Sequence, residues 1–352
     1  MSRYLATLLG AAASCLLAIA SINCIVDING VYHPAERSRW AADYVAALRA
    51  STDGLVFIPY ERPVKLALLR STDADCYVTG SSQQMQLTLD NFAPAHASCR
   101  SLVNITESAA TFEDLLTQIG ELADHPGLRR LYVGVAPWML RRGADARWTE
   151  ERMALQHACT RLGLDASRYR LALTDRLKLL HNAINSDYLW RNLQSLPDRK
   201  ALIVAAAQAD DADRVMLPDG SFWYSRLYLL AHAPRQQSEG DGSYKIAQPY
   251  VSAAVLEELG TALTVLTRRG VQVVFLLAPY HPSVMGCRQP QVCEAMTAVT
   301  VAVRELASRI GAQVLGSYDP ALSDLSWRDF YDDMHISADA LGRTSWPSAL
   351  TP

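Results

Sequence analysis

The chain has 352 residues, of which 50% are hydrophobic and 20% are charged, and its formal net charge is −3. This is a globular composition with enough apolar material for a sizeable core. The small net charge and the lack of a basic run give no support for nucleic-acid binding, so no nucleic acid is expected among its partners.

The N-terminal segment is the first predicted element. After Arg3, the run from Tyr4 to Val26 carries no charge, and its length matches the roughly 20 apolar residues that span a bilayer. Arg3 favours an N-terminus on the cytoplasmic side. We therefore expect a single-pass anchor in the cytoplasmic (inner) membrane, with the main domain extracytoplasmic, in the periplasm. The sequence Ala18-Ile19-Ala20 leaves cleavage of this segment as an alternative.

The cysteines agree with an oxidising compartment. Cys287 and Cys293 bracket a short loop, which predicts a local disulfide, and Cys76 and Cys99 form a second possible pair between neighbouring strands. Cys159 is left as a free, buried thiol. The sequence has no Cys-x-x-Cys motif and no cluster of cysteine with histidine, so neither a zinc site nor a cofactor is expected.

The hydrophobic pattern after the anchor alternates between helical and strand periods. Helices are predicted over 38–50, 64–70, 111–123, 150–162, 175–193, 251–269 and 292–310, and strands over 77–79, 101–105, 131–135, 271–277 and 313–315. Strand, helix and strand at this spacing form parallel crossover units. The predicted fold class is therefore α/β, a three-layer α/β/α arrangement around a central, mostly parallel sheet.

Three regions follow from this pattern. Residues 1–27 are the anchor, 28–74 a linker and helical segment, and 75–352 the α/β domain, which a mostly helical insertion interrupts at about 141–245. Within the insertion, the run from Met216 to Tyr224 is typical of a hairpin that turns at Asp219-Gly220. Residues 201–207 fit either a strand or part of a helix.

The stretch Gly80-Ser81-Ser82 follows a predicted strand and precedes a run that can form a helix. A glycine at such a turn tolerates the backbone angles that let the hydroxyl of Ser82 stand clear at a helix N-terminus, where negative charge is favoured. The alternative is an ordinary helix cap, since serine is common there.

A serine nucleophile needs a base and a group that orients the base. Near the other end of the chain, Asp332 precedes His335 by three positions, so Asp332 can hold one ring nitrogen while the other faces Ser82. Asp333 is the alternative orienting group. The alternative for His335 is a surface histidine after an acidic loop.

Several strands end in residues suited to a site, because parallel strands present their carboxyl ends at one edge of the sheet. Asn104 is a candidate oxyanion donor or a turn-forming residue. Tyr280 and His281 are candidates for substrate contact or for a structural role in their loop. Trp138 is either a platform for a sugar ring or a core aromatic.

The order of these motifs resembles that of the SGNH (GDSL-type) hydrolases, in which a glycine and a nucleophilic serine follow the first strand and Asp-x-x-His comes late. The membrane-anchored, DltD-like branch is most similar, because it has an N-terminal anchor and Gly-Ser-Ser in place of Gly-Asp-Ser. The strand endings GVAPW and LLAPYHP also resemble that branch. The resemblance covers about 75–140 and 250–345.

The resemblance implies an SGNH-hydrolase-like fold and a serine esterase or O-acyltransferase, with Ser82 as nucleophile, His335 as base and Asp332 as its orienting group. The implied partners are an acylated cell-envelope polysaccharide or other glycan and a membrane-bound O-acyltransferase. One departure is the run from Gly134 to Pro137, which lacks the asparagine of the family's Gly-x-Asn-Asp block. The alternative is therefore a catalytically weak or inactive glycan-binding or assembly protein.

Overall fold

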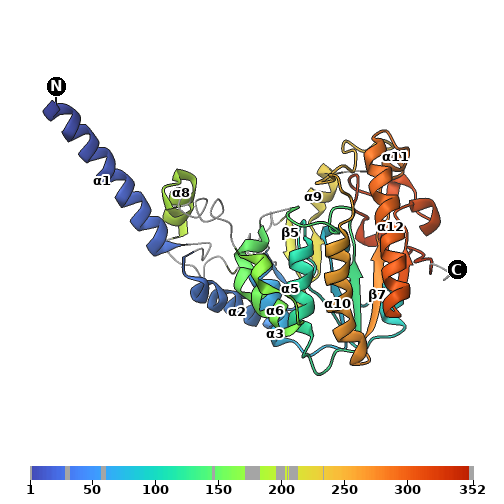
Figure 1. The fold of residues 1–352 in the computed structure, drawn as a ribbon. Coiled ribbons are helices and arrows are strands. Elements are labelled where there is room, and N and C mark those ends of the chain that lie inside the picture. Colours follow the sequence, from blue (N-terminus) through green and yellow to red (C-terminus); the bar gives the residue numbers. More distant parts are fainter. Residues whose placement is uncertain are drawn as a thin grey trace.

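The structure is a computed structural model that describes residues 2–27, 32–56, 61–144, 147–170, 183–195, 203, 205, 213–232 and 234–348. Its α/β body contains a five-stranded sheet flanked by helices, a small three-stranded sheet, and a long N-terminal helix that extends away from the body (Figure 1).

The central sheet consists of β2 (Cys76–Thr79), β3 (Leu102–Asn104), β4 (Arg130–Gly134), β7 (Gln272–Leu277) and β8 (Gln313–Gly316). Its strand order is β3-β2-β4-β7-β8, and all four pairings are parallel. The register aligns Tyr77 with Leu131, and Leu131 in turn with Val273. This is a doubly wound order, and its direction reverses between β2 and β4, which is where such sheets bind ligands.

The two faces of the sheet bury alternate residues, as the pleat of a strand requires. Tyr77 and Phe275 belong to the larger core, which α5 (Phe112–Leu122), α10 (Ala253–Arg268) and α12 (Pro290–Ile310) cover. Val78 and Val274 belong to the smaller core on the other face. Short segments supply residues to that core: Ala95 of α4 (Ala93–His96), Ala340 of α13 (Ala338–Leu341), and Leu325, which lies between η6 (Pro320–Ser323) and η7 (Trp327–Asp329).

The N-terminal segment that precedes the central sheet shares its core. Tyr44 of α2 (Pro34–Ala50) and Leu68 of α3 (Glu61–Ser71) are fully buried in the larger cluster. The expected boundary at residue 74 is therefore not a break in the packing, because the apolar faces of these helices need the sheet domain to cover them.

The insertion also joins the N-terminal segment through a second sheet. There, β1 (Leu55–Val56) pairs antiparallel with β5 (Arg214–Met216), and β5 pairs with β6 (Phe222–Tyr224). The β5–β6 hairpin closes with the Gly220 N–H donating to Leu217 O at 2.8 Å, as the Asp-Gly turn predicted.

The helices of the insertion flank α5 and the N-terminal helix. The expected helix over 150–162 is α6 (Arg152–Arg161), next to η2 (Arg147–Glu151) and η3 (Ala166–Tyr169). It packs so closely on α5 that a Cβ at Gly120 would lie 2.3 Å from the Cβ of Ala158. The helix expected over 175–193 lies partly outside the described residues, and α8 (Ser186–Ser195) is found where its C-terminal part was expected. The ambiguous segment 201–207 lies mostly outside the described residues.

The N-terminal helix α1 (Ser2–Val26) contains the uncharged run Tyr4–Val26, with a mean hydropathy of 2.1 over its most apolar window. No part of that window is buried against the rest of the chain. By length and composition, α1 is able to cross a membrane.

Both disulfides expected from the sequence are present. Cys76–Cys99 joins the start of β2 to the segment before β3, and Cys287–Cys293 joins the loop after α11 (Pro282–Met285) to the first turn of α12. Cys159 is free and buried, and burial raises the pKa of its thiol to about 12.

Candidate active site

Three side chains from opposite ends of the chain meet beyond the carboxyl ends of β2 and β8. Ser82 Oγ lies 2.8 Å from His335 Nε2, and His335 Nδ1 lies 2.6 Å from Asp332 Oδ2. Because the carboxylate accepts the Nδ1 proton, Nε2 is the acceptor in the neutral ring and the Ser82 hydroxyl donates to it. This is the relay of hydrogen bonds by which a serine hydroxyl is activated.

Asp332 is fixed by the backbone that follows it. Its Oδ1 accepts from the N–H groups of Met334 at 2.9 Å and His335 at 2.7 Å, which leaves Oδ2 for the imidazole. Burial alone would raise the pKa of Asp332, but His335 and these N–H groups lower it below its ordinary value. The orienting carboxylate is therefore held in its charged form.

His335 is held from a second side by an aromatic ring. The rings of Tyr331 and His335 are stacked, with centroids 5.5 Å apart and planes 5° from parallel. Burial lowers the pKa of His335, but Asp332 and Asp333 outweigh that effect and raise the pKa above 6.5. The imidazolium that forms when His335 takes a proton is thus stabilised by its surroundings.

The turn that carries Ser82 depends on glycines. Gly80 has φ +139°, and a Cβ there would lie 2.9 Å from the Cα of Gly134 at the end of β4. A Cβ at Gly134 would in turn lie 2.4 Å from the side chain of Gln84. The two strand ends therefore approach each other only because both residues lack side chains.

The segment after Ser82 differs from the expected helix. Only a three-residue 3-10 turn, η1 (Ser82–Gln84), forms there. The Asn104 amide donates to the carbonyls of Gln84 at 2.8 Å and Leu87 at 2.9 Å, and the Phe222 N–H donates to Met85 O at 2.8 Å. These tertiary donors take the carbonyls that a continuing helix would have used.

This arrangement also corrects the expectation for Asn104. Its side chain is fully buried, and its Oδ1 accepts from the N–H of Thr106 at 3.1 Å and from the Thr106 hydroxyl at 2.5 Å. Both ends of the amide are therefore committed, so Asn104 fixes the serine turn and is not an oxyanion donor.

Among the described residues, the N–H groups of Ser82 and Gln83 have no acceptor, which leaves these two donors free at the start of η1.

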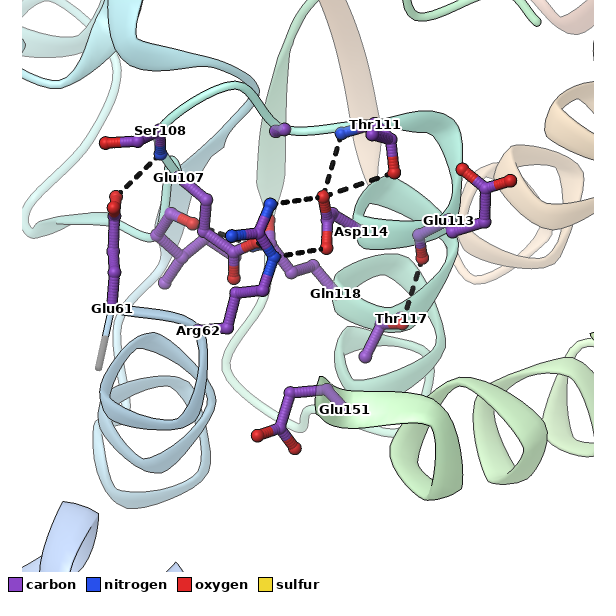
Figure 2. Close-up of polar contacts among 12 residues, drawn as sticks. Glu61, Arg62, Glu107, Ser108, Thr111, Glu113, Asp114, Thr117, Gln118 and Glu151 are labelled. Carbon is purple, nitrogen blue, oxygen red and sulfur yellow. Dashed lines mark hydrogen bonds and ion pairs between the residues drawn. The ribbon is translucent and has the colours of Figure 1, made fainter. Parts of the chain in front are cut away.

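A buried charged cluster lies behind the serine turn (Figure 2). Arg62 of α3 donates two hydrogen bonds, of 2.9 and 2.8 Å, to Asp114 of α5 and lies 3.6 Å from Glu107. Burial and the Asp114 charge raise the pKa of Glu107 well above its ordinary value, which favours its neutral form. The Glu107 N–H donates to Gly80 O at 3.0 Å, so this cluster bonds directly to the turn.

Lys65 supports the same region from α3. It is fully buried, and its ammonium donates to the backbone carbonyls of Asn104, at 2.9 Å, and Gly220. Burial lowers its pKa to about 8. Lys65 thus joins the end of β3 to the β5–β6 turn. The hydrophobic pattern of the sequence did not indicate this role of Lys65.

The other three residues expected at the substrate are all buried. Trp138 is 1% exposed and donates from its indole N–H to Ala110 O at 2.9 Å, so its ring faces are closed to a sugar. Tyr280 is fully buried, with its ring edge against Tyr318. His281 is also buried: its Nδ1 accepts from the Ser283 N–H at 3.1 Å and its Nε2 lies 3.0 Å from Arg235 O.

Asp333 points away from the imidazole. Its Oδ2 accepts from the Gly242 N–H at 2.9 Å, and its backbone carbonyl accepts from the His281 N–H at 3.0 Å. It therefore holds the loop before α10, and Asp332 is the orienting group.

A cavity of about 90 Å³ lies beside Asp332. Its walls are Ala231, His232, Arg235, Ser238, Glu239, Gly240, His281, Phe330 and Tyr331.

The fold and this geometry define an α/β protein with a serine, histidine and aspartate aligned at the switch point of a parallel sheet. Compared with known proteins, the chain matches no protein-family model and no curated protein.

Proposed function

We propose that this chain is a membrane-anchored SGNH-type serine esterase or O-acyltransferase. The observation that carries the proposal is the alignment of Ser82 Oγ, His335 and Asp332 at 2.8 and 2.6 Å in a site where Ser82 keeps partial exposure. The strand order, with the serine after the first strand of the sheet and Asp-x-x-His after the last, supports an SGNH-like fold.

In the first half of the reaction, Ser82 Oγ attacks the ester carbonyl while His335 Nε2 takes the hydroxyl proton. The carbonyl oxygen becomes an oxyanion, which the free N–H groups of Ser82 and Gln83 are available to stabilise. When the tetrahedral intermediate collapses, the ester C–O bond breaks, and His335 returns the proton to the departing alcohol. The acyl group is then an ester on Ser82.

In the second half, His335 accepts a proton from an incoming hydroxyl, which attacks the acyl-serine carbonyl. The Ser82 oxygen leaves with the proton that His335 gives back, and the free serine is restored. Water as the incoming group makes the protein an esterase, whereas a sugar hydroxyl makes it an acyltransferase.

The proposed substrate is an acylated cell-envelope polysaccharide, with the body on the extracytoplasmic side of the inner membrane and a membrane-bound O-acyltransferase as partner. The apolar helix α1 and the two disulfides support this placement. The substrate itself follows from the resemblance of Gly80-Ser81-Ser82 and Asp332-x-x-His335 to the membrane-anchored branch of the family.

A second candidate is a glycan-binding or assembly protein that keeps the fold with little catalysis. Two observations favour it: the run after β4 has no asparagine, and the Asn104 amide is committed to backbone carbonyls. Only backbone donors then remain for the oxyanion, and removing one side-chain donor from such a site costs about 10²–10³ in kcat.

Serine-directed labelling separates the two candidates. A fluorophosphonate probe should label the full-length protein, and labelling should disappear in Ser82→Ala and in His335→Ala. Hydrolysis of a nitrophenyl ester should fall by several orders of magnitude in each variant, and the double variant should lose little more, because the two residues act as a unit.

Ser81→Ala is the matched control, since Ser81 is buried next to Ser82 in the chain, whereas the two ring nitrogens of His335 bond to Ser82 and Asp332. It should keep most of the activity. Equal labelling of wild type and Ser82→Ala, or no labelling of the folded wild type, would contradict the proposal that the protein is an enzyme. The glycan-binding or assembly protein would then be the remaining candidate.

A further inference from the structure

Helix α8 lies beside the C-terminal part of α1 (Figure 1). Asn23 of α1 donates from Nδ2 to the backbone carbonyls of Ala183 at 2.9 Å and Asn185 at 3.1 Å. Asn192 of α8 donates to Asn23 Oδ1 at 3.0 Å, and the side chains of Asn23 and Asn192 are both fully buried. These three bonds fasten α8 to one point of α1.

That point lies close to the end of the apolar run. Asn23 is three residues before Val26, the last residue of the run, so at 1.5 Å per residue it is about 5 Å from the end. If α1 spans a bilayer, α8 is therefore held at the level where hydrocarbon gives way to headgroups. This boundary region is where amphipathic helices lie on a membrane.

The outer side of α8 has the composition that suits this boundary. Trp190 is 63% exposed and Leu193, three residues further on the same side of the helix, is 38% exposed. Asn192, by contrast, faces α1. Ile184, just before the helix, is 47% exposed. Tryptophan is enriched at membrane interfaces because its amphipathic ring suits the headgroup level.

We infer that α8 is an interfacial helix that lies on the lipid bilayer beside the α1 span, with Trp190 and Leu193 directed into the lipid. The occupant of this apolar surface is the acyl-chain and headgroup boundary of the membrane. The inference rests on α1 as the membrane anchor of the proposed function, and it adds a second membrane contact that orients the body relative to the bilayer.

The test measures lipid contact in the full-length protein, reconstituted in vesicles of phosphatidylcholine and phosphatidylglycerol. The free cysteines Cys15, Cys24 and Cys159 are replaced by serine, and an NBD fluorophore is attached to Trp190→Cys. We expect a blue-shifted emission that lipids with a doxyl group near the headgroup quench strongly. Leu193→Cys is the second variant on the same side and should give the same result.

Val301→Cys is the matched control, because Val301 is a 50% exposed apolar residue on α12 of the body. It should show the emission of a water-exposed label and no quenching. A variant that keeps only Cys15 reports on the span itself, since Cys15 is exposed in the middle of α1. Its label should be quenched by doxyl groups deep in the acyl chains.

The outcomes separate two hypotheses: that α1 spans the bilayer, and that α8 lies on it. If the label on Cys15 is quenched while labels at 190 and 193 behave like that at 301, α8 does not touch lipid and α1 remains the anchor. A blue shift at 190 without quenching means that protein covers this side, which also overturns the inference. No quenching at Cys15 overturns the span and the inference together, whereas the probe labelling of Ser82 is independent of either result.

Discussion

At the scale of residues, the site depends on two hydrogen bonds in series, from Ser82 Oγ to His335 Nε2 and from His335 Nδ1 to Asp332 Oδ2. The separation of Asp332 and His335 by two residues lets one carboxylate cap its own turn and still reach the ring, since the N–H groups of Met334 and His335 both donate to Oδ1. The ring is therefore oriented before any substrate arrives. Preorganised groups of this kind cost no rearrangement during the reaction.

The pH dependence of activity follows from the same groups. His335 must be neutral to accept the proton of Ser82, so kcat/KM should fall as the pH drops through the pKa of His335. Because Asp332 raises that pKa, the inflection should lie above 6.5. In Asp332→Asn the charge is lost and burial remains, so the inflection should move to lower pH and the rate should fall.

The measurement is the pH profile of kcat/KM for a nitrophenyl ester, with wild type and Asp332→Asn compared in the same buffers. Asp333→Asn is the control: this carboxyl does not bond to the ring, so its profile should change less. An inflection that is the same in wild type and Asp332→Asn would show that Asp332 does not set the pKa of His335.

At the scale of elements, the segment after β2 is shaped by donors from elsewhere in the chain. Asn104 supplies donors to the carbonyls of Gln84 and Leu87, and Lys65 in turn holds the backbone of Asn104. The turn that carries Ser82 is thus supported from β3 and α3. Its local sequence alone predicts a helix there.

The expected consequence is that Asn104→Ala destabilises the protein. In this variant Leu87 O loses its donor, and the N–H and hydroxyl of Thr106 lose their acceptor, whereas Gln84 O keeps the Leu87 N–H. Each buried polar group left without a partner costs about 1–3 kcal/mol, so we expect a loss of roughly 3 kcal/mol in the free energy of unfolding, with reduced esterase activity. Denaturant unfolding of the detergent-solubilised chain measures this. Asn91→Ala is the control: the half-buried Asn91 amide donates to Gln86 O at 2.8 Å and accepts from the Thr88 N–H at 2.8 Å. Because water can reach this partly exposed site, the loss there should be smaller, about 1 kcal/mol.

At the scale of the whole molecule, the fold brings together two segments that are 253 residues apart in the sequence, those of Ser82 and His335, at the switch point between β2 and β4. The serine follows the first strand of the central sheet, and the aspartate and histidine follow the last, β8. The N-terminal helices α2 and α3 complete this body, because the buried ion pair of Arg62 with Asp114 fastens α3 to α5 (Figure 2).

Removing the ion pair between Arg62 and Asp114 should destabilise the packing of α3 on α5. Arg62→Met leaves Asp114 buried without its cation, which is expected to cost about 3–5 kcal/mol of stability. Arg70→Met removes the neighbouring pair with Glu121, but Arg70 is 48% exposed, so it should cost no more than about 1 kcal/mol. Thermal or denaturant unfolding of the two variants provides the comparison, and equal losses would contradict a structural role for the buried pair.

The sequence by itself determined the features that depend on local pattern. Apolar periodicity placed the strands and helices of the central sheet to within a few residues, and the uncharged run from Tyr4 identified α1. The short spacing of Cys287 and Cys293 predicted their disulfide. The glycine before Ser82 and the spacing of Asp332 and His335 identified the residues that meet, because each motif is contained within a few positions.

Only the tertiary structure decided the roles that depend on partners far along the chain. Asn104, Trp138 and His281 end strands as a site residue would, yet each is buried and its polar atoms bond to backbone from distant segments. The helix expected after Ser82 was replaced by a 3-10 turn for the same reason. A sequence shows which side chains are able to donate or accept, but the packed chain determines which acceptor each donor reaches.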